Sequence, residues 1–566
     1  MEKFKDIEYV RPDLKAINKQ LKKVIKGIKK ANSYQEFKDK VTEAEGLLVE
    51  NMDTSTLCSI RNDINKNDKF YEQERNYLNE KSTGISLTMI SLYKALVKSP
   101  YRKEFDEEYG YFLTKKIEES LKLSNLFSIL DEVKESKLAE QYSKDAALCQ
   151  VDFKGEKCNF YGLLKHMEST DRQERKEAFE AWANLYESVS DKLDATYDKL
   201  VKLRVKKAKH LGFANFIDYI YPARERYDYK AKDIEQFRNN VREVIVPFCQ
   251  ELFDKQKERL GIDKLHFYDE ALVFPEGNAL PIGNKDELVN KALKMYTEMS
   301  KETGEYFNFM VDHELFDLET HPGKRLGGYC TFLPKSKAPF IFSNFNGTSA
   351  DVDVLTHEAG HAFQAYLTSF ENDIPDLSFP TMESCEIHSM SMEFFAHPWM
   401  ELFFKEDTEK YYYSHIASTL SFLPYGVLVD HFQHEVYNNP NMSKEERKAT
   451  FRKLEKMYIP ETDYHDYPIL EKGGYFYRQG HIFESPFYYI DYTLAQVCAL
   501  QFFKRMLDKD ENCWKDYIHL CKLGGTKPFL ELVEEAKLVS PFKDNCLEGV
   551  VNRIYEELDK IDDTKL

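Results

Sequence analysis

The sequence lacks long hydrophobic runs. No stretch of about 18 apolar residues occurs in its 566 residues, so no membrane-spanning helix is predicted. The N-terminus, which begins Met1-Glu2-Lys3, has no apolar core of a secretory signal. Ten cysteines are dispersed from Cys58 to Cys546 without a CxxC pair. We therefore expect reduced thiols and a cytoplasmic location.

Glycine and proline are sparse, at 23 and 19 residues, and we see no disordered linker, low-complexity segment or clear repeat. Positive charge is in the minority, with 79 basic against 97 acidic residues and a net charge of −18. That balance argues against binding to nucleic acid or to an anionic membrane. The composition gives no indication of the oligomeric state.

Helical periodicity dominates the chain and predicts a mostly α-helical fold with a small β-sheet. Residues 12–31 place aliphatic side chains on one stripe, and Arg172–His210 forms a very long helical stretch. Capping boxes at Ser33 to Glu36 and Thr170 to Gln173 predict two helix starts. Strands are predicted at only four places: residues 265–268, 271–274, Tyr329–Leu333 and 340–345.

The pentapeptide His357-Glu358-Ala359-Gly360-His361 is the most informative motif. In a helix the two histidines are four residues apart and lie on one face, so both imidazoles can bind one Zn²⁺. Glu358 then lies beside the open coordination position and is predicted to be the general base that activates a zinc-bound water. Gly360 costs a helix about 1 kcal/mol relative to alanine, which indicates close packing at that position.

An aromatic and aliphatic stretch at residues 339–345 precedes the motif and ends in the turn Asn346-Gly347. A strand there would lie beside the zinc helix. We expect it to pair with a substrate backbone by strand addition, which holds peptides of varied sequence.

A catalytic zinc needs a third protein ligand. The segment Met382–Phe395 offers Glu383, Glu386, His388 and Glu393, and helical spacing alone does not choose among these four.

The pair HEAGH and EIHSMSME, the second starting 29 residues after His357, resembles the thimet oligopeptidase and oligoendopeptidase F family of zinc metallopeptidases. The likeness covers about residues 200–560. It implies one Zn²⁺ per chain with Glu386 as the third ligand, and Glu393 as a residue that orients a ligand histidine. Many members have a further histidine where this chain has Gln364, which points to the branch that resembles bacterial oligoendopeptidase F and Pz-peptidase.

The same resemblance implies a histidine and tyrosines that stabilise the oxyanion formed by attack on an amide. They carry over to His481 and Tyr492, and with a weaker match to Tyr488 and Tyr489. The sequence predicts a helix that starts with Ser485 as N-cap and Pro486 at the first position. The three tyrosines would then lie in its first two turns.

The resemblance also implies two lobes flanking a deep substrate channel, with zinc on its floor. Such a channel admits flexible oligopeptides and excludes folded proteins. At 566 residues the chain exceeds the size of one core. We expect an N-terminal helical lobe at residues 1–195 that covers the channel, and a catalytic domain at residues 196–566.

The predicted function is therefore a zinc endopeptidase that cleaves internal bonds of short oligopeptides. Two alternatives remain: a zinc carboxypeptidase or dipeptidase of related helical fold, and a non-catalytic peptide-binding scaffold. A third motif, His431-Phe432-Gln433-His434-Glu435, has the wrong order for a zinc site and is predicted to lie on a helix surface.

Overall fold

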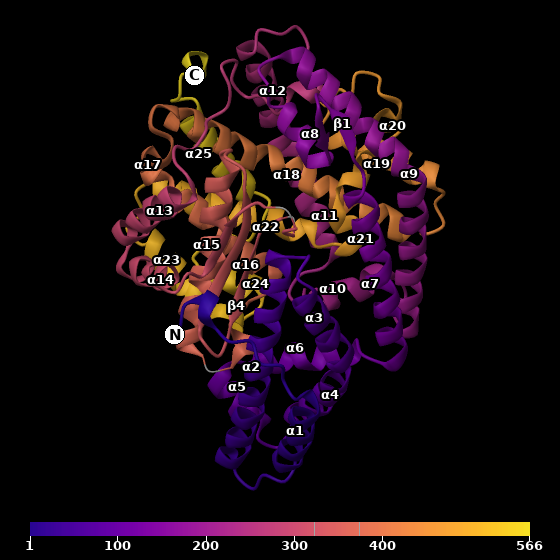
Figure 1. Ribbon diagram of the computed structural model, residues 1–566, viewed down its shortest axis with the longest axis vertical. Coiled ribbons are helices and arrows are strands. Elements are labelled where there is room, and N and C mark those ends of the chain that lie inside the picture. The colour runs from indigo at the N-terminus through magenta and orange to yellow at the C-terminus, as the bar shows by residue number, and fades with distance from the viewer. Residues whose placement is uncertain (322, 326, 373) are drawn as a thin grey trace. The chain divides into compact units, whose positions relative to one another are not determined.

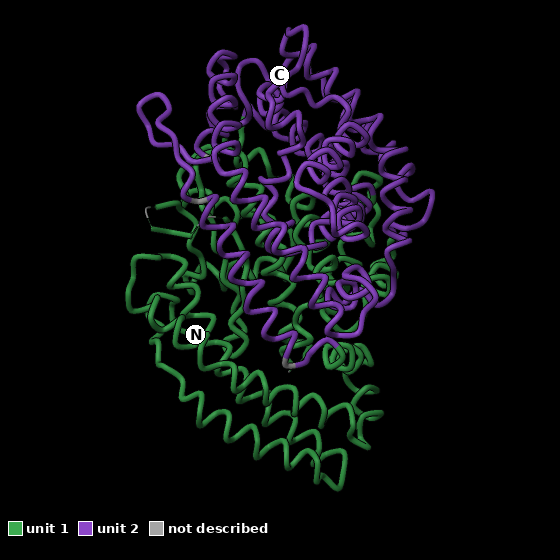
Figure 2. Tube along the Cα trace, turned by 90° about the vertical axis from the view of Figure 1, so that its right-hand side faces the viewer, with its two compact units in different colours: residues 1–122, 280–405, 505–538 green, residues 123–279, 406–504, 539–566 purple. Residues whose placement is uncertain are grey.

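The computed structural model describes residues 1–566 except 322, 326 and 373, and for residues 126, 147 and 161 only the backbone. The chain forms two compact units, and each is assembled from three segments (Figure 2). Unit 1 comprises Met1–Lys122, Leu280–Lys405 and Arg505–Leu538, and unit 2 comprises Leu123–Ala279, Glu406–Lys504 and Val539–Leu566. The sequence predicted one boundary near residue 195, whereas the chain enters unit 2 at residue 123. A covering role for residues 1–195 stays a prediction.

Unit 1 is helical around one small sheet. Its N-terminal helices are α1 (Leu14–Ile28), α2 (Tyr34–Ile64), α3 (Lys69–Lys81), α4 (Thr83–Val97), α5 (Arg102–Tyr109) and α6 (Tyr111–Lys122). Later segments add α13 (Lys285–Met299), α14 (Lys301–Asp312), α15 (Ala350–Glu371), α16 (Met382–Phe395), α17 (Glu401–Phe404), α23 (Cys513–Leu523) and α24 (Phe529–Glu535). The aliphatic stripe predicted at residues 12–31 is α1, and its buried side chains, among them Leu21 and Val24, belong to the core of these helices.

Unit 2 is also helical. Its helices are α7 (Leu126–Ala147), α8 (Phe160–His166), α9 (Arg172–His210), α10 (Phe216–Ala223), α11 (Ala231–Asn240), α12 (Val246–Arg259), α18 (Thr408–Asn438), α19 (Lys444–Tyr458), α20 (Pro468–Glu471), α21 (Gly480–Glu484), most of α22 (Tyr489–Leu507) and α25 (Cys546–Leu558). The helix predicted at Arg172–His210 is confirmed. A short hairpin of β1 (Val151–Phe153) and β2 (Glu156–Cys158), which the sequence did not predict, precedes α8 (Figure 1).

The three-stranded sheet of unit 1 has the order β3 (Phe316–Glu319), β5 (Ala338–Phe345), β4 (Tyr329–Leu333). The strands predicted at Tyr329–Leu333 and 340–345 are confirmed, and β3 was missed. Strand β5 pairs with β3 in parallel and with β4 in antiparallel orientation. Because β5 is hydrogen-bonded on both sides, the prediction that residues 339–345 pair with a substrate is wrong.

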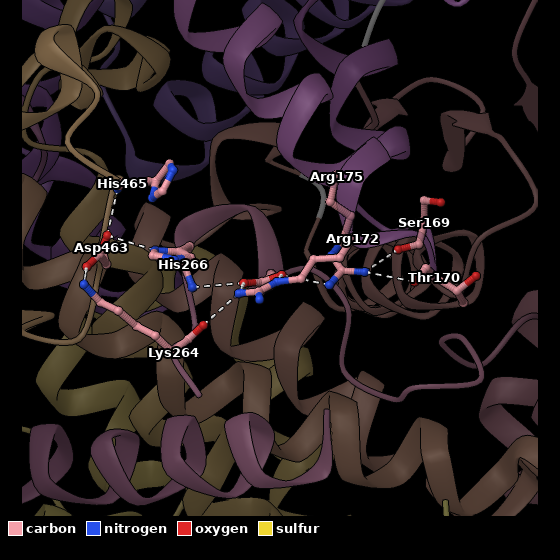
Figure 3. A network of polar contacts seen from close by, with 9 residues as sticks. Ser169, Thr170, Arg172, Arg175, Lys264, His266, Asp463 and His465 are labelled. Atoms are coloured by element: carbon pink, nitrogen blue, oxygen red, sulfur yellow. Dashed lines mark hydrogen bonds and ion pairs between the residues drawn. The ribbon is translucent and has the colours of Figure 1, made fainter. Parts of the chain in front are cut away.

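Two other predicted strands are also wrong. Residues 265–268 and 271–274 form a 3₁₀ turn and loop around Asp269, whose buried carboxylate accepts hydrogen bonds from Arg172 Nη2 and Arg175 Nη2, both at 2.8 Å. Figure 3 shows this network at the start of α9. Apolar side chains such as Phe274 are buried here without a partner strand.

The same region corrects one helix cap. The side chain of Asp171, not Thr170, caps α9, since its carboxylate accepts from the Gln173 N–H at 2.9 Å. The cap predicted at Ser33 is confirmed, because its hydroxyl accepts from the Glu36 N–H at 3.2 Å.

Candidate active site

The His357-Glu358-Ala359-Gly360-His361 motif lies in the middle of helix α15. The loop before α15 is closed by Asp351, whose carboxylate accepts from the backbone N–H of Asn346 at 2.9 Å and of Gly347 at 2.8 Å. The rings of His357 and His361 are 5.1 Å apart between centroids and lie on one face, as the four-residue spacing predicts.

Helix α16 packs against α15 next to β4 (Figure 1). A Cβ on Gly360 would lie 2.6 Å from both the His388 carbonyl oxygen and the Ser389 Cα. Only a residue without a side chain fits there, which confirms the close packing expected at Gly360. This contact brings α16 to the histidine face of α15.

The buried carboxylate of Glu386 on α16 faces both histidines. Its Oε2 lies 3.4 Å from Nε2 of His357 and 3.4 Å from Nε2 of His361. Zinc bound through nitrogen and oxygen at about 2.0–2.1 Å holds neighbouring tetrahedral ligand atoms roughly 3.3 Å apart. The three side chains thus have the chemistry and the spacing of a site that could hold a divalent cation.

Glu393 contacts the other nitrogen of His357. Its Oε1 lies 2.6 Å from His357 Nδ1. In the neutral ring a carboxylate there accepts from Nδ1–H, so the lone pair is on Nε2, which is the nitrogen that faces Glu386. The structure therefore places Glu393 where it orients His357.

Burial and the neighbouring charges set the electrostatics of this group. Burial alone would lower the pKa of His357, but its hydrogen bonds to Glu386 and Glu393 raise that pKa above the ordinary value. Burial would raise the pKa of Glu386, but the imidazoles of His361 and His357 hold it well below its usual range. The side chains of His357, His361 and Glu386 therefore favour a positive charge between them.

Glu358 is buried on the same helix, and burial raises the pKa of its carboxyl, against the opposing effect of the His357 and His361 imidazoles. It lies close to the start of β4, because a Cβ on Gly328 would be 3.7 Å from Glu358 Oε1. A raised pKa brings a carboxylate nearer to the range useful for proton transfer at neutral pH.

The remaining candidates from the 382–395 segment do not belong to the group. His388 is fully buried, its ring packs near Tyr517, and its carbonyl oxygen accepts from the Tyr517 hydroxyl at 2.9 Å. Glu383 is likewise fully buried. Neither residue is in the set whose donor atoms converge.

Gln364, which departs from the family pattern, forms hydrogen bonds through its side-chain amide. Its Nε2 donates to Thr368 Oγ1 at 2.7 Å and to the Ser378 carbonyl at 2.8 Å. The amide thus ties α15 to the segment that leads into α16.

The residues predicted to stabilise the oxyanion lie in unit 2. The ring centroid of His481 on α21 lies 5.0 Å from that of Tyr489, 5.7 Å from that of Tyr488 and 5.8 Å from that of Tyr492. The helix predicted from Ser485 instead begins at Tyr489, because Phe487 has a φ of 61° and breaks it. Tyr489 and Tyr492 are in its first turn and Tyr488 precedes it.

Two residues of this group were missed from the sequence. Gln479 Nε2 lies 2.6 Å from His481 Nδ1, and the hydroxyl of Tyr425 donates to Gln479 Oε1 at 2.9 Å. In this orientation the amide donates to Nδ1, so the ring proton of neutral His481 is on Nε2. Tyr425 is 54 residues before Gln479, and no spacing signal joins them.

The His431 to Glu435 motif lies in α18, where His431 Nδ1 is 3.0 Å from the Tyr458 hydroxyl. His434 is buried rather than on the helix surface, so that part of the prediction is wrong. Its Nε2 is 3.5 Å from Asp430 Oδ2.

In the part of the chain that the structure describes, no helix has the length and apolar character needed to cross a membrane. A family model described as Peptidase family M3 matches residues 165–551, and one described as Peptidase M3 N-terminal domain matches residues 4–124.

Three relatives illustrate the similarity. The chain is 23% identical over 389 residues to an oligoendopeptidase F homolog of Borreliella burgdorferi, which is 64% of this chain and 61% of that protein. It is 28% identical over 213 residues to the oligoendopeptidase F of Lactococcus lactis subsp. cremoris, which is 37% of this chain and 33% of that protein. The chain thus spans less than two thirds of either relative. A solved structure of Pz peptidase A with an inhibitor has a TM-score of 0.94 and 44% identity, covering 99% of this chain and 100% of that chain.

The resemblance predicted from the two motifs is confirmed by these findings. The model of Peptidase family M3 matches more than half of this chain. The chain therefore belongs to peptidase family M3 and is an enzyme of the metallopeptidase class.

Proposed function

We propose that this chain is a zinc-dependent endopeptidase that hydrolyses internal bonds of short oligopeptides. The observation that carries the proposal is the convergence of His357, His361 and Glu386 beside the buried carboxylate of Glu358. Membership of peptidase family M3 supports the reaction class. The names of the similar proteins, oligoendopeptidase F and Pz peptidase, support oligopeptides as substrates and cleavage within the chain.

In this proposal His357, His361 and Glu386 hold the metal, and Glu393 keeps His357 in the tautomer whose Nε2 can bind it. Two imidazoles and one carboxylate are a ligand set typical of catalytic zinc, which keeps its remaining position for water or substrate. When bound, zinc would polarise the substrate carbonyl and lower the pKa of a coordinated water.

Glu358 is the proposed general base and acid. Its carboxylate accepts a proton from the attacking water and then passes that proton to the nitrogen of the leaving amine. A purely structural zinc site would give this buried carboxylate no task, which disfavours the scaffold alternative.

His481 and Tyr492 are the proposed donors to the oxyanion, with Tyr489 and Tyr488 as further candidates. In the orientation that Gln479 and Tyr425 support, neutral His481 carries a hydrogen on Nε2 and can donate it. A donated hydrogen bond stabilises negative charge on the amide oxygen in the transition state.

Strand β4 is the proposed template for the substrate backbone, in place of residues 339–345. It pairs with β5 on one side and has no strand on its other side among the described residues. Its start lies against Glu358, so a peptide added to the outer edge of β4 would pass the proposed base.

Mass spectrometry of an oligopeptide mixture tests the function. The zinc-loaded chain should release internal fragments, and a chelator should stop the reaction. Release of single residues or pairs from one terminus would favour the carboxypeptidase or dipeptidase alternative. Unchanged peptides would favour the scaffold.

A further inference from the structure

A second group of potential metal ligands lies in unit 2, at the β1–β2 hairpin. Glu156 and Cys158 on β2 and His166 at the end of α8 each offer a donor atom, and these atoms lie within 4.8 Å of one another. Within the described ranges, this is the only such group besides that of His357, His361 and Glu386.

The local fold explains why the three side chains meet. Lys154 and Gly155 have φ values of 49° and 87°, and this left-handed pair forms a tight two-residue hairpin turn. Glu156 and Cys158 are two residues apart on β2 and therefore point to the same face. A Cβ on Gly162 would lie 3.4 Å from Cys158 Sγ, so the thiol lies against α8 one turn before His166.

His166 is oriented by a carboxylate. Its Nδ1 lies 2.7 Å from Oε1 of Glu174, and Oε2 of Glu174 forms an ion pair with Lys154 Nζ at 3.2 Å. Glu174 thus accepts from Nδ1–H and leaves the lone pair of the ring on Nε2. A carboxylate behind a histidine is the arrangement that orients ligand histidines in metal sites.

The corner that carries His166 and Glu174 is held in place. Arg175 donates to the Ser169 carbonyl at 2.8 Å, a contact that Figure 3 shows, and to Asp269 Oδ1 at 2.8 Å. Arg175, in the first turn of α9, thus links the loop that follows α8 to the buried carboxylate of Asp269.

The other two side chains are available. Cys158 is buried, and neither its thiol nor the carboxylate of Glu156 hydrogen-bonds to any residue that the structure describes. Glu156 is exposed at the hairpin, with its carboxylate within 4.8 Å of the thiol. A buried thiol next to an oriented imidazole has the softness that zinc prefers and that magnesium and calcium do not.

We propose that Glu156, Cys158 and His166 bind a divalent transition metal, Zn²⁺ by preference, with water as the fourth ligand. Zinc bonds of about 2.0–2.3 Å place tetrahedral ligand atoms roughly 3.3–3.6 Å apart. Because the three donor atoms lie within 4.8 Å of one another, the approach needed on binding is at most about 1.5 Å. The thiol releases its proton as the metal binds, so binding weakens as the pH falls. This site does not depend on the proposed peptidase reaction.

Cobalt titration of the full-length, metal-free chain tests the site. Co²⁺ replaces Zn²⁺ at such sites, and a thiolate ligand gives a cobalt charge-transfer band in the near ultraviolet that imidazole and carboxylate ligands do not give. The group of His357, His361 and Glu386 contains no thiol, so the band reports Cys158. We expect two equivalents of bound metal, one of them with the band.

Three variants sharpen the test. C158S should remove the band and one equivalent of metal while peptide hydrolysis is retained. C149S is the matched control, because Cys149 is a partly exposed cysteine of the same unit outside the cluster, and it should retain the band. E174Q should keep the band but weaken cobalt affinity about 10-fold or more. Absence of the band in the unmodified chain, or its persistence in C158S, would overturn the proposal.

Discussion

In His357 the ring atom Nδ1 faces a hydrogen-bond acceptor, whereas in His481 the same atom faces a hydrogen-bond donor. Nδ1 of His357 faces a carboxylate oxygen of Glu393 at 2.6 Å, whereas Nδ1 of His481 faces the amide nitrogen of Gln479 at 2.6 Å. Glu393 accepts a hydrogen bond from Nδ1–H of His357, so the neutral ring keeps its lone pair on Nε2, as a metal ligand needs. Gln479 donates a hydrogen bond to Nδ1 of His481, so the neutral ring carries its hydrogen on Nε2, as an oxyanion donor needs. The neighbour of Nδ1 thus assigns each histidine its proposed role.

The largest expected effect comes from a substitution on helix α15 that distinguishes the proposed base from the proposed metal ligands. E358Q should retain bound zinc while kcat falls about 10³-fold, because an amide cannot accept the proton from water. Metal analysis and cleavage of a quenched peptide measure the two quantities. Unreduced turnover would contradict the role of Glu358 as the base.

The second largest effect is expected when the hydrogen-bond donor beside His481 Nδ1 is replaced by an acceptor. In Q479E the carboxylate accepts from Nδ1–H, so the neutral ring no longer carries a hydrogen on Nε2. We expect a kcat about 10²-fold lower, which is the effect of losing one oxyanion donor, with a smaller change in KM.

Nitrogen-15 NMR of the labelled chain reads the tautomer of His481 directly. Y425F is the milder companion, because it removes the hydroxyl that orients the Gln479 amide but keeps the amide itself. A proton found on Nδ1 in the unmodified chain would break the comparison with His357.

The partner of His357 is the third target. E393Q should weaken zinc affinity by about 10- to 100-fold, since the carboxylate behind a ligand histidine fixes its tautomer and raises its basicity. Competition with a chelator gives the affinity. E371Q, at the exposed end of α15, is the control and should bind zinc as the unmodified chain does. Equal affinities in both variants would contradict the orienting role of Glu393.

The smallest effect concerns His434, a histidine in a buried environment. Burial lowers its pKa to about 4, with Arg238 and Arg226 adding to the decrease and Asp430 opposing it. The unfolded chain, with a pKa near 6.5, binds the proton first, so the free energy of unfolding decreases as the pH falls from 6.5 towards 4. The loss is about 1.4 kcal/mol at one unit below 6.5.

Denaturant unfolding as a function of pH measures this dependence. H434Q should remove that part of the acid sensitivity, whereas H465Q, at an exposed histidine of the same unit, should retain it. The same acid sensitivity in H434Q and the unmodified chain would contradict a neutral His434.

Much of this structure could be predicted from local patterns in the sequence. The i, i+4 spacing of His357 and His361 lies within one helix, and the strand at Tyr329–Leu333 has the predicted bounds. Three other residues besides Glu386 were candidates for the third ligand. The sequence could not choose among them, because the choice depends on the tertiary contact between α16 and α15. The apolar residues 271–274 were read as a strand because burial in a loop against Asp269 gives the same pattern as burial in a sheet. Gln479 and Tyr425 were missed because only the fold joins them.

Gly360 has a consequence for protein engineering. The missing side chain at this position sets the distance between α15 and α16, with the His388 carbonyl oxygen 2.6 Å from where a Cβ would lie. A designer who transplants the histidine motif into another helical scaffold must therefore bring the glycine, the partner helix and their crossing as one module. Two histidines copied alone would lack the carboxylate that completes the set.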